Sequence, residues 1–70
     1  MKNLDRIKYH TFRADLRINV FSALSGSDSF SDKEADKYLS DTRHHLEKAL
    51  LHLDELEVER MMDSMKEKAK

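Results

Sequence analysis

The sequence predicts an all-α fold, a helical hairpin with a helix over about residues 4–24, a turn over residues 25–31 and a long helix over about residues 32–68. Three observations predict it. The 70-residue chain has no proline and one glycine, a composition that suits long helices. Apolar residues recur at spacings of three and four in both halves of the chain. Serine and glycine gather in the short segment between these halves.

The predicted first helix carries apolar or small residues at successive spacings of 3, 4, 3, 4 and 3. These residues are Leu4, Ile7, Thr11, Ala14, Ile18 and Phe21. Residues 12–20 also alternate strictly between apolar and polar side chains, which is typical of a half-buried strand. We favour a helix because the helical spacing extends over the whole segment and because the chain offers no second strand for pairing. The sequence alone leaves both structures open for residues 12–20.

The boundary between the two helices is marked by residues 25–31, which read Ser-Gly-Ser-Asp-Ser-Phe-Ser. Gly26 suits the left-handed conformation that often follows the end of a helix. Ser31 suits the N-cap of the next helix, and Glu34 three residues later completes the pattern of a capping box. One helix is therefore expected to stop and another to start here.

The predicted second helix has one row of apolar or small residues at heptad spacing. The row consists of Ala35, Leu39, Thr42, Leu46, Ala49, Leu53 and Leu56. Its small members permit the close approach of an antiparallel helix. We therefore predict that this row is the seam against the first helix and that Leu46 and Leu53 are buried in it.

Beyond this seam the apolar pattern changes. At about 1.5 Å of rise per residue, the first helix covers the second only to about residue 53. Residues 54–70, within a single domain of residues 1–70, are then an overhang or a third helical segment. The apolar residues of this part leave the seam and gather on another face as Val58, Met61, Met62 and Met65. Methionine is flexible and is common on surfaces that bind variable partners.

These four residues are therefore predicted to bind a partner protein. The chain would then be a small non-enzymatic interaction module, acting as an adaptor, an inhibitor or a regulator. It is also expected to form a homodimer that resembles a four-helix bundle. A chain of this size buries only about 60% of the surface that it exposes when unfolded. Because Leu, Ile, Val and Phe together make up only 16 of 70 residues, a second subunit is the expected remedy for a thin core.

An alternative function is nucleic-acid binding through a basic stripe on the first helix. Arg6, His10, Arg13 and Arg17 are spaced by 4, 3 and 4 residues and would contact successive phosphates. The net charge of −1 does not by itself indicate such a partner. Residues 1–24 carry a net charge of +3 and residues 25–70 a net charge of −4, so the two helices also attract each other.

Other classes of function find little support in the sequence. We predict no catalytic residue and no cofactor, since a chain this small has little room for both a core and a water-excluding pocket. We also predict no metal site. The pairs His44–Glu47 and His52–Glu55 lie on one helix, about 12 Å apart, and cannot share an ion.

The expected location is the cytoplasm, without membrane contact. The longest apolar run is a few residues, whereas a membrane span needs about 20. The first residues lack the apolar run of a secretory signal, and the chain has no cysteine for disulfide bonds. No motif in the sequence identifies a family.

Overall fold

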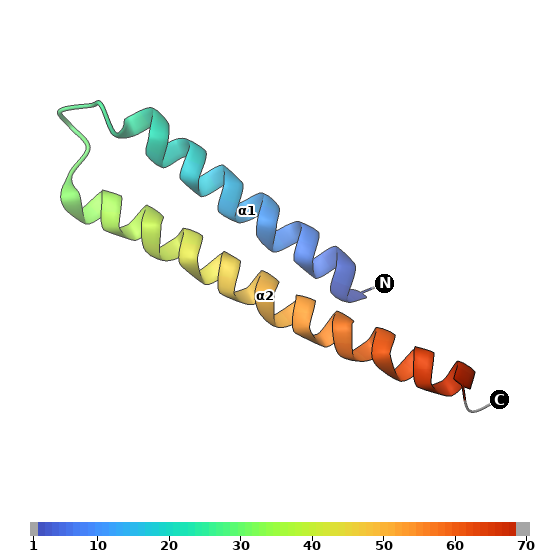
Figure 1. Ribbon diagram of the computed structural model, residues 1–70. Helices are drawn as coiled ribbons and strands as arrows, with labels where there is room; N and C mark the ends of the chain where they lie inside the picture. The colour runs from blue at the N-terminus through green and yellow to red at the C-terminus, as the bar shows by residue number, and fades with distance from the viewer. Residues whose placement is uncertain (1, 69–70) are drawn as a thin grey trace.

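The computed structural model describes residues 2–68 and shows an all-helical hairpin (Figure 1). Helix α1 spans Lys2–Leu24 and helix α2 spans Asp32–Lys68. The two helices run antiparallel, and α2 extends beyond the start of α1. The molecule is a rod of 64 × 14 × 14 Å. The predicted hairpin and its boundaries are confirmed, and residues 12–20 are helical rather than extended.

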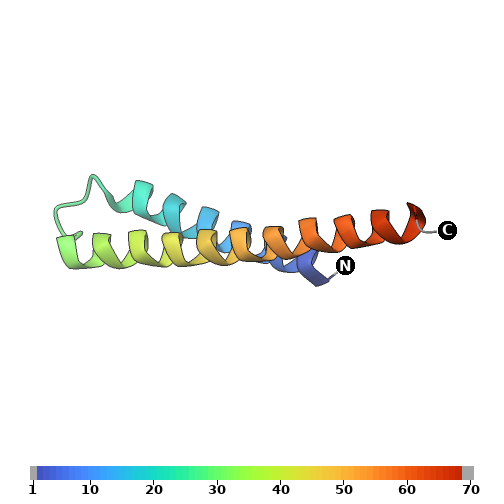
Figure 2. The same ribbon diagram turned by 60° about the horizontal axis from the view of Figure 1, so that its bottom comes forward.

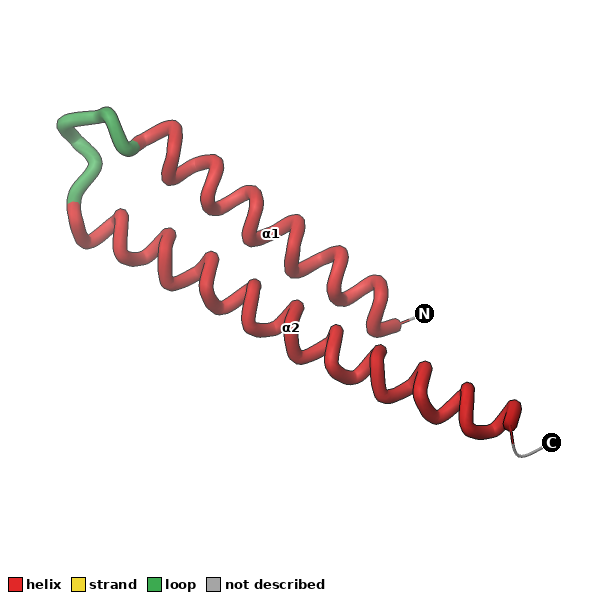
Figure 3. Tube along the Cα trace, viewed as in Figure 1, coloured by secondary structure: helices red, strands yellow, loops and turns green. Residues whose placement is uncertain are grey.

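The chain reverses in the loop over residues 25–31 (Figure 3). The Ser25 amide donates to the Phe21 carbonyl at 3.0 Å, and the Ser27 amide donates to the Leu24 carbonyl at 3.0 Å. These bonds satisfy the last carbonyls of α1 without a left-handed residue, and Gly26 does not have a positive φ. The expected left-handed conformation of Gly26 is therefore wrong.

Ser31 caps the start of α2, as predicted. The Glu34 amide donates to Ser31 Oγ at 3.1 Å, so Ser31 is the N-cap. Phe30, immediately before the cap, packs its ring against Phe21 and Tyr38, with ring centroids 5.7 and 6.0 Å apart. This aromatic cluster packs the loop end of the hairpin against both helices.

The seam between the helices is rotated relative to the prediction. The half-buried or buried residues with spacings of 4 and 3 are Asn3, Ile7, His10, Ala14, Arg17, Phe21 and Leu24 on α1, and Ala35, Tyr38, Thr42, His45, Ala49, His52 and Leu56 on α2. Leu39, Leu46 and Leu53 are instead exposed. The prediction that Leu46 and Leu53 are buried against the first helix is therefore wrong.

The rotation has a simple geometric cause. The row of small residues on α2 is flanked on one side by leucines and on the other by Tyr38, His45 and His52, and a single neighbouring helix can cover only one flank. Ala14 and Ala49, with 3% and 7% of their surface exposed, mark the tight packing of the two helices. In Figure 2, α1 crosses obliquely behind α2.

The contact between the helices extends further than expected. Asn3 Nδ2 donates to Glu59 Oε1 at 2.7 Å, so α1 covers α2 to residue 59 rather than to about residue 53. The reason is that α1 begins at Lys2 and that burial on α2 starts one turn into the helix, at Ala35. Residues 54–68 continue α2 without a break and form no third segment. Residues 69–70 lie outside the described part of the chain.

Candidate interaction surfaces

Three histidines meet in the seam. His10 Nδ1 on α1 lies 3.1 Å from His45 Nδ1 on α2, and the His10 ring stacks on that of His52 with centroids 5.7 Å apart and planes 9° from parallel. Tyr9 meets the edges of His10 and His45. At 3.1 Å one Nδ1 must donate a hydrogen bond and the other must accept it. At least one of the two Nδ1 atoms therefore carries no proton.

Burial and neighbouring positive groups lower the pKa values of two of these rings, His10 and His45, and so favour their neutral forms. Burial, and then the neighbouring His45, lowers the pKa of His10. Burial, and then His44, lowers the pKa of His45. The third ring is incompletely satisfied, because His52 Nδ1 has no hydrogen-bond partner and lies 3.6 Å from Glu55 Oε2. A seam built from imidazoles contributes little apolar burial to the fold.

The sequence did not single out this cluster, although a signal was present. His45 and His52 are seven residues apart and share a helix face with Tyr38, which lies a further seven residues toward the N-terminus. Three or more His, Asp or Glu side chains arranged to hold a metal ion do not occur within the described range. The pair His44–Glu47 and the pair His52–Glu55 thus form no such group.

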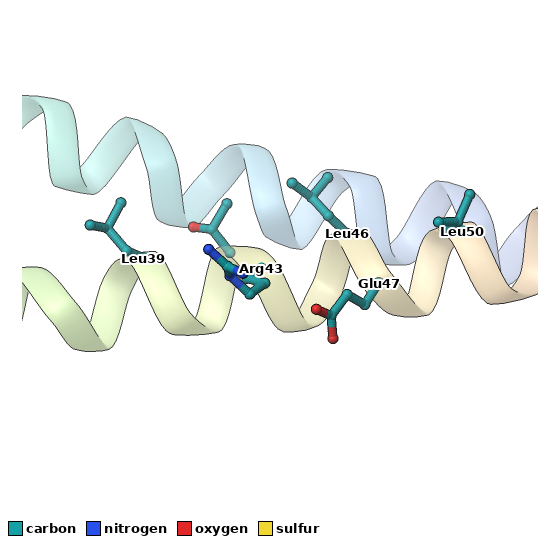
Figure 4. A pocket seen from close by; sticks show the side chains of 6 residues that line it. Leu39, Arg43, Leu46, Glu47 and Leu50 are labelled. Carbon is teal, nitrogen blue, oxygen red and sulfur yellow. The ribbon is translucent and has the colours of Figure 1, made fainter.

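One apolar surface of the hairpin lies along the side of the seam. We call it the leucine surface, and it comprises Leu39, Leu46, Leu50 and Leu53 on α2 together with Leu4 and Ile18 on α1. On α2 it forms a shallow groove lined also by Thr42, Arg43 and Glu47. Figure 4 shows Leu39, Leu46 and Leu50 pointing to one side of α2, whereas Glu47 points away from them.

The second exposed apolar surface lies at the end of α2. We call it the methionine surface, and it comprises the residues predicted to bind a partner, Val58, Met61, Met62 and Met65. All four are more than half exposed. Their spacing of 3, 1 and 3 residues places them on one face of the helix. Three of the four lie beyond Glu59, where α1 no longer covers α2.

The fold places the residues of the predicted basic stripe in two different environments. Arg6 is exposed, whereas His10, Arg13 and Arg17 are half-buried and face α2. Arg17 Nε lies 4.0 Å from Asp41 Oδ2, which makes a long ion pair. The Nε atoms of Arg13 and Arg17 are buried without a hydrogen-bond partner. His10 and Arg17 therefore belong to the seam and Arg13 lies beside it, so all three are less accessible to phosphates than Arg6 is.

Comparison with known proteins gives no relative from which a function could be transferred. No protein-family model matches the chain, and neither the curated proteins nor the solved structures give a match. Over residues 2–68, neither helix combines the length and the apolar character that crossing a membrane requires. The two apolar surfaces are thus the features from which a function has to be argued.

Proposed function

We propose that the protein is a small non-enzymatic interaction module that binds a partner protein through the methionine surface. The observation that carries this proposal is the exposure of Met61, Met62 and Met65 on a helix end that α1 does not cover. An amphipathic helical end of this kind can dock its apolar face in a groove of another protein. The flexible thioether side chains suit a contact that adapts to its partner.

The proposed module works as a homodimer that resembles a four-helix bundle. Its support is the shortage of apolar burial in the single hairpin. Among the side chains of residues 2–66, only Ala14, Ala49 and Asn3 are buried, and none of them is a large apolar group. A helical pair with so small a core rarely folds stably alone. The absence of cysteine and of long apolar runs agrees with work in the cytoplasm, which is part of the proposal.

Partner binding is tested with the double variant Met62→Lys/Met65→Lys. The tagged protein would be used to capture proteins from its source cells, with mass spectrometry as the readout. We expect the variant to lose the captured partner while its sedimentation mass and helical circular dichroism stay unchanged. Asp63→Lys is the matched control because it changes the net charge by the same two units on the opposite side of the same turn.

Two results would contradict the partner-binding role. If the double variant captures the same protein as the wild type, the methionine surface is not the binding site. If it loses its dimer mass or its helicity, the surface serves the fold rather than recognition. Loss of capture in Asp63→Lys as well would show that net charge, not the thioether face, governs the interaction.

Nucleic-acid binding through Arg6, His10, Arg13 and Arg17 is the less supported proposal. The partial burial of the last three residues argues against it, because half-buried side chains are poorly placed to track a phosphate backbone. A mobility-shift experiment at low salt tests it directly. Salt-sensitive binding that is abolished by Arg6→Gln would revive the proposal, and absence of a shift would remove it.

A further inference from the structure

We infer that a second copy of this chain packs against the leucine surface. The inference rests on the homodimer of the proposed function and assigns the surface that forms it. The methionine surface would then stay free for the partner protein.

The hairpin exposes more surface than a compact protein of its mass. Its accessible surface is 5866 Å² for a mass of 8.3 kDa. A compact monomer of this mass exposes roughly 4,600 Å², so the excess is about 1,300 Å². A standard protein interface buries roughly 800 Å² on each partner. The excess is therefore large enough for one full interface with a second subunit.

The leucines of both helices lie on the same side of the hairpin. On α2, Leu39, Leu46 and Leu53 each follow a seam residue by one position. On α1, Leu4 follows Asn3 and Ile18 follows Arg17 in the same way. In an antiparallel pair, rows rotated in the same sense from the contact line emerge on one common side. The two rows thus make a single broad face, as one half of a four-helix bundle requires.

The charges on the rim favour a copy of the same chain over a nucleic acid or a charged membrane. Arg43 and Glu47 border the groove one helical turn apart, so the rim of α2 carries both signs. A two-fold related copy presents the same two charges and can pair each with its opposite. Beside its small and apolar residues, the seam inside the hairpin holds polar side chains, which are those of Asn3, His10, Arg17, His45 and His52. The larger gain from apolar burial is therefore available outside the hairpin, between two copies.

The first experiment compares two leucines that are equally exposed in the single hairpin. Leu46, in the leucine surface, is 51% exposed, and Leu51, on another face of α2, is 49% exposed. The chain contains no cysteine, so Leu46→Cys and Leu51→Cys each introduce one unique thiol. Their rates of reaction with a maleimide would be measured at high and at low protein concentration.

We expect the thiol at position 46 to react at least about tenfold more slowly than the thiol at position 51 at high concentration, because the second copy covers it. Dilution below the dissociation constant should bring the two rates together. Equal rates at all concentrations would overturn the inference. Cysteine is a small apolar residue, so Leu46→Cys is not designed to prevent dimerisation. The reaction rates therefore report on the dimer itself.

The second experiment measures association directly. Leu46→Gln/Leu53→Gln should weaken the dimer about 100-fold or more by sedimentation equilibrium, whereas Leu51→Gln should leave the mass unchanged. If the wild type is a dimer and both variants remain dimers of equal strength, the surface assignment is wrong but the proposed homodimer stands. If the wild type is a monomer with a cooperative unfolding transition, both are wrong. Partner capture by the methionine surface is measured separately from either result.

Discussion

His10 and His45 hold their Nδ1 atoms 3.1 Å apart across the seam between α1 and α2. Two protonated imidazoles at this distance would repel each other, and the groups around them add to the repulsion. Arg13 and Arg17 face the pair from α1, and Lys48 lies near it on α2. Protonation of both rings should therefore weaken the packing of α1 against α2.

The stability of the hairpin should fall as the pH falls below about 6.5, the ordinary pKa of histidine. In the folded chain, burial first and neighbouring positive groups second lower the pKa of both His10 and His45, while Asp41 opposes the shift of His45. Below pH 6.5 the unfolded chain thus binds more protons than the folded one, and protonation favours unfolding. The melting temperature would be followed by circular dichroism between pH 7.5 and 5.

The control for this prediction is the double variant His10→Gln/His45→Gln. Its melting temperature should change less between pH 7 and 5.5 than that of the wild type. Exposed carboxylates contribute little in this range because their ordinary pKa values lie near 4. An identical pH dependence in the wild type and the double variant would mean that the two histidines are not the groups that titrate.

Asn3→Ala should destabilise the protein by about 1–2 kcal/mol. Asn3 is 6% exposed, and its amide donates to the Glu59 carboxylate at 2.7 Å, so the variant loses a charge-assisted hydrogen bond between the two helices. The measurement is urea unfolding followed by circular dichroism. Asn19→Ala is the matched control, since Asn19 is exposed and bonds only within α1, to Asp15 at 3.3 Å. Equal effects of the two substitutions would contradict the pairing of Asn3 with Glu59.

Enlarging Ala14 or Ala49 should also destabilise the hairpin. Both methyl groups lie where the helices pack tightly, and a leucine at either position has to push α1 and α2 apart. We expect Ala14→Leu and Ala49→Leu each to cost about 1–3 kcal/mol by urea unfolding. The exposed Ala23 on the same helix as Ala14 provides the control, and Ala23→Leu should be nearly neutral. If Ala14→Leu were equally harmless, the seam would not run through residue 14.

Ser31→Ala should lower the free energy of unfolding by about 1 kcal/mol. The substitution removes the hydroxyl that accepts the Glu34 amide at 3.1 Å at the start of α2. Ser40→Ala, at an exposed position inside α2, should instead stabilise the helix slightly, because alanine has the higher helix propensity. Thermal unfolding of the two variants in parallel would show opposite signs. A Ser31→Ala variant that is as stable as the wild type, or more stable, would show that Ser31 is not the N-cap.

The backbone of this protein could be predicted from the sequence because its signals are local. Three signals that each act within a few residues predict the helix boundaries nearly as observed. They are the absence of proline, the spacing of apolar residues and the Ser31–Glu34 pair. The conformation of Gly26 was not predictable in this way. Successive right-handed turns, closed by Ser25 and Ser27, end α1 equally well.

The choice of seam could not be predicted, because it depends on what else packs against the helix. Ala35, Thr42, Ala49 and Leu56 lie in both the predicted and the observed seam, so the pattern located the centre of the face correctly. Judged by hydrophobicity alone, the leucine flank should be buried against the first helix in preference to the flank that holds His45. In the single hairpin α1 covers the histidine flank, which leaves the leucines exposed for a second copy in our account.

For the same reason, the exposure of the methionine surface could be predicted from the sequence, whereas the exposure of the leucine surface could not. The exposure of the methionine surface was predictable because the second helix is longer than the first. The lengths of both helices follow directly from their predicted residue ranges. The sequence pattern places Leu39, Leu46 and Leu53 in the interior, because a pattern of apolar residues does not distinguish burial by the same chain from burial by another chain. The exposure of the leucine surface became visible only from the arrangement of α1 over His45 and Ala49.

In the proposed dimer, this hairpin folds as one half of a two-chain unit. Thermal unfolding at two protein concentrations about 100-fold apart distinguishes this unit from a stable single hairpin, because a folded state that contains two chains is stabilised by mass action. For a two-chain unit of this size the melting temperature should rise by about 10 °C at the higher concentration. An unchanged melting temperature, with a single cooperative transition at both concentrations, would contradict the claim and show that the hairpin is stable alone.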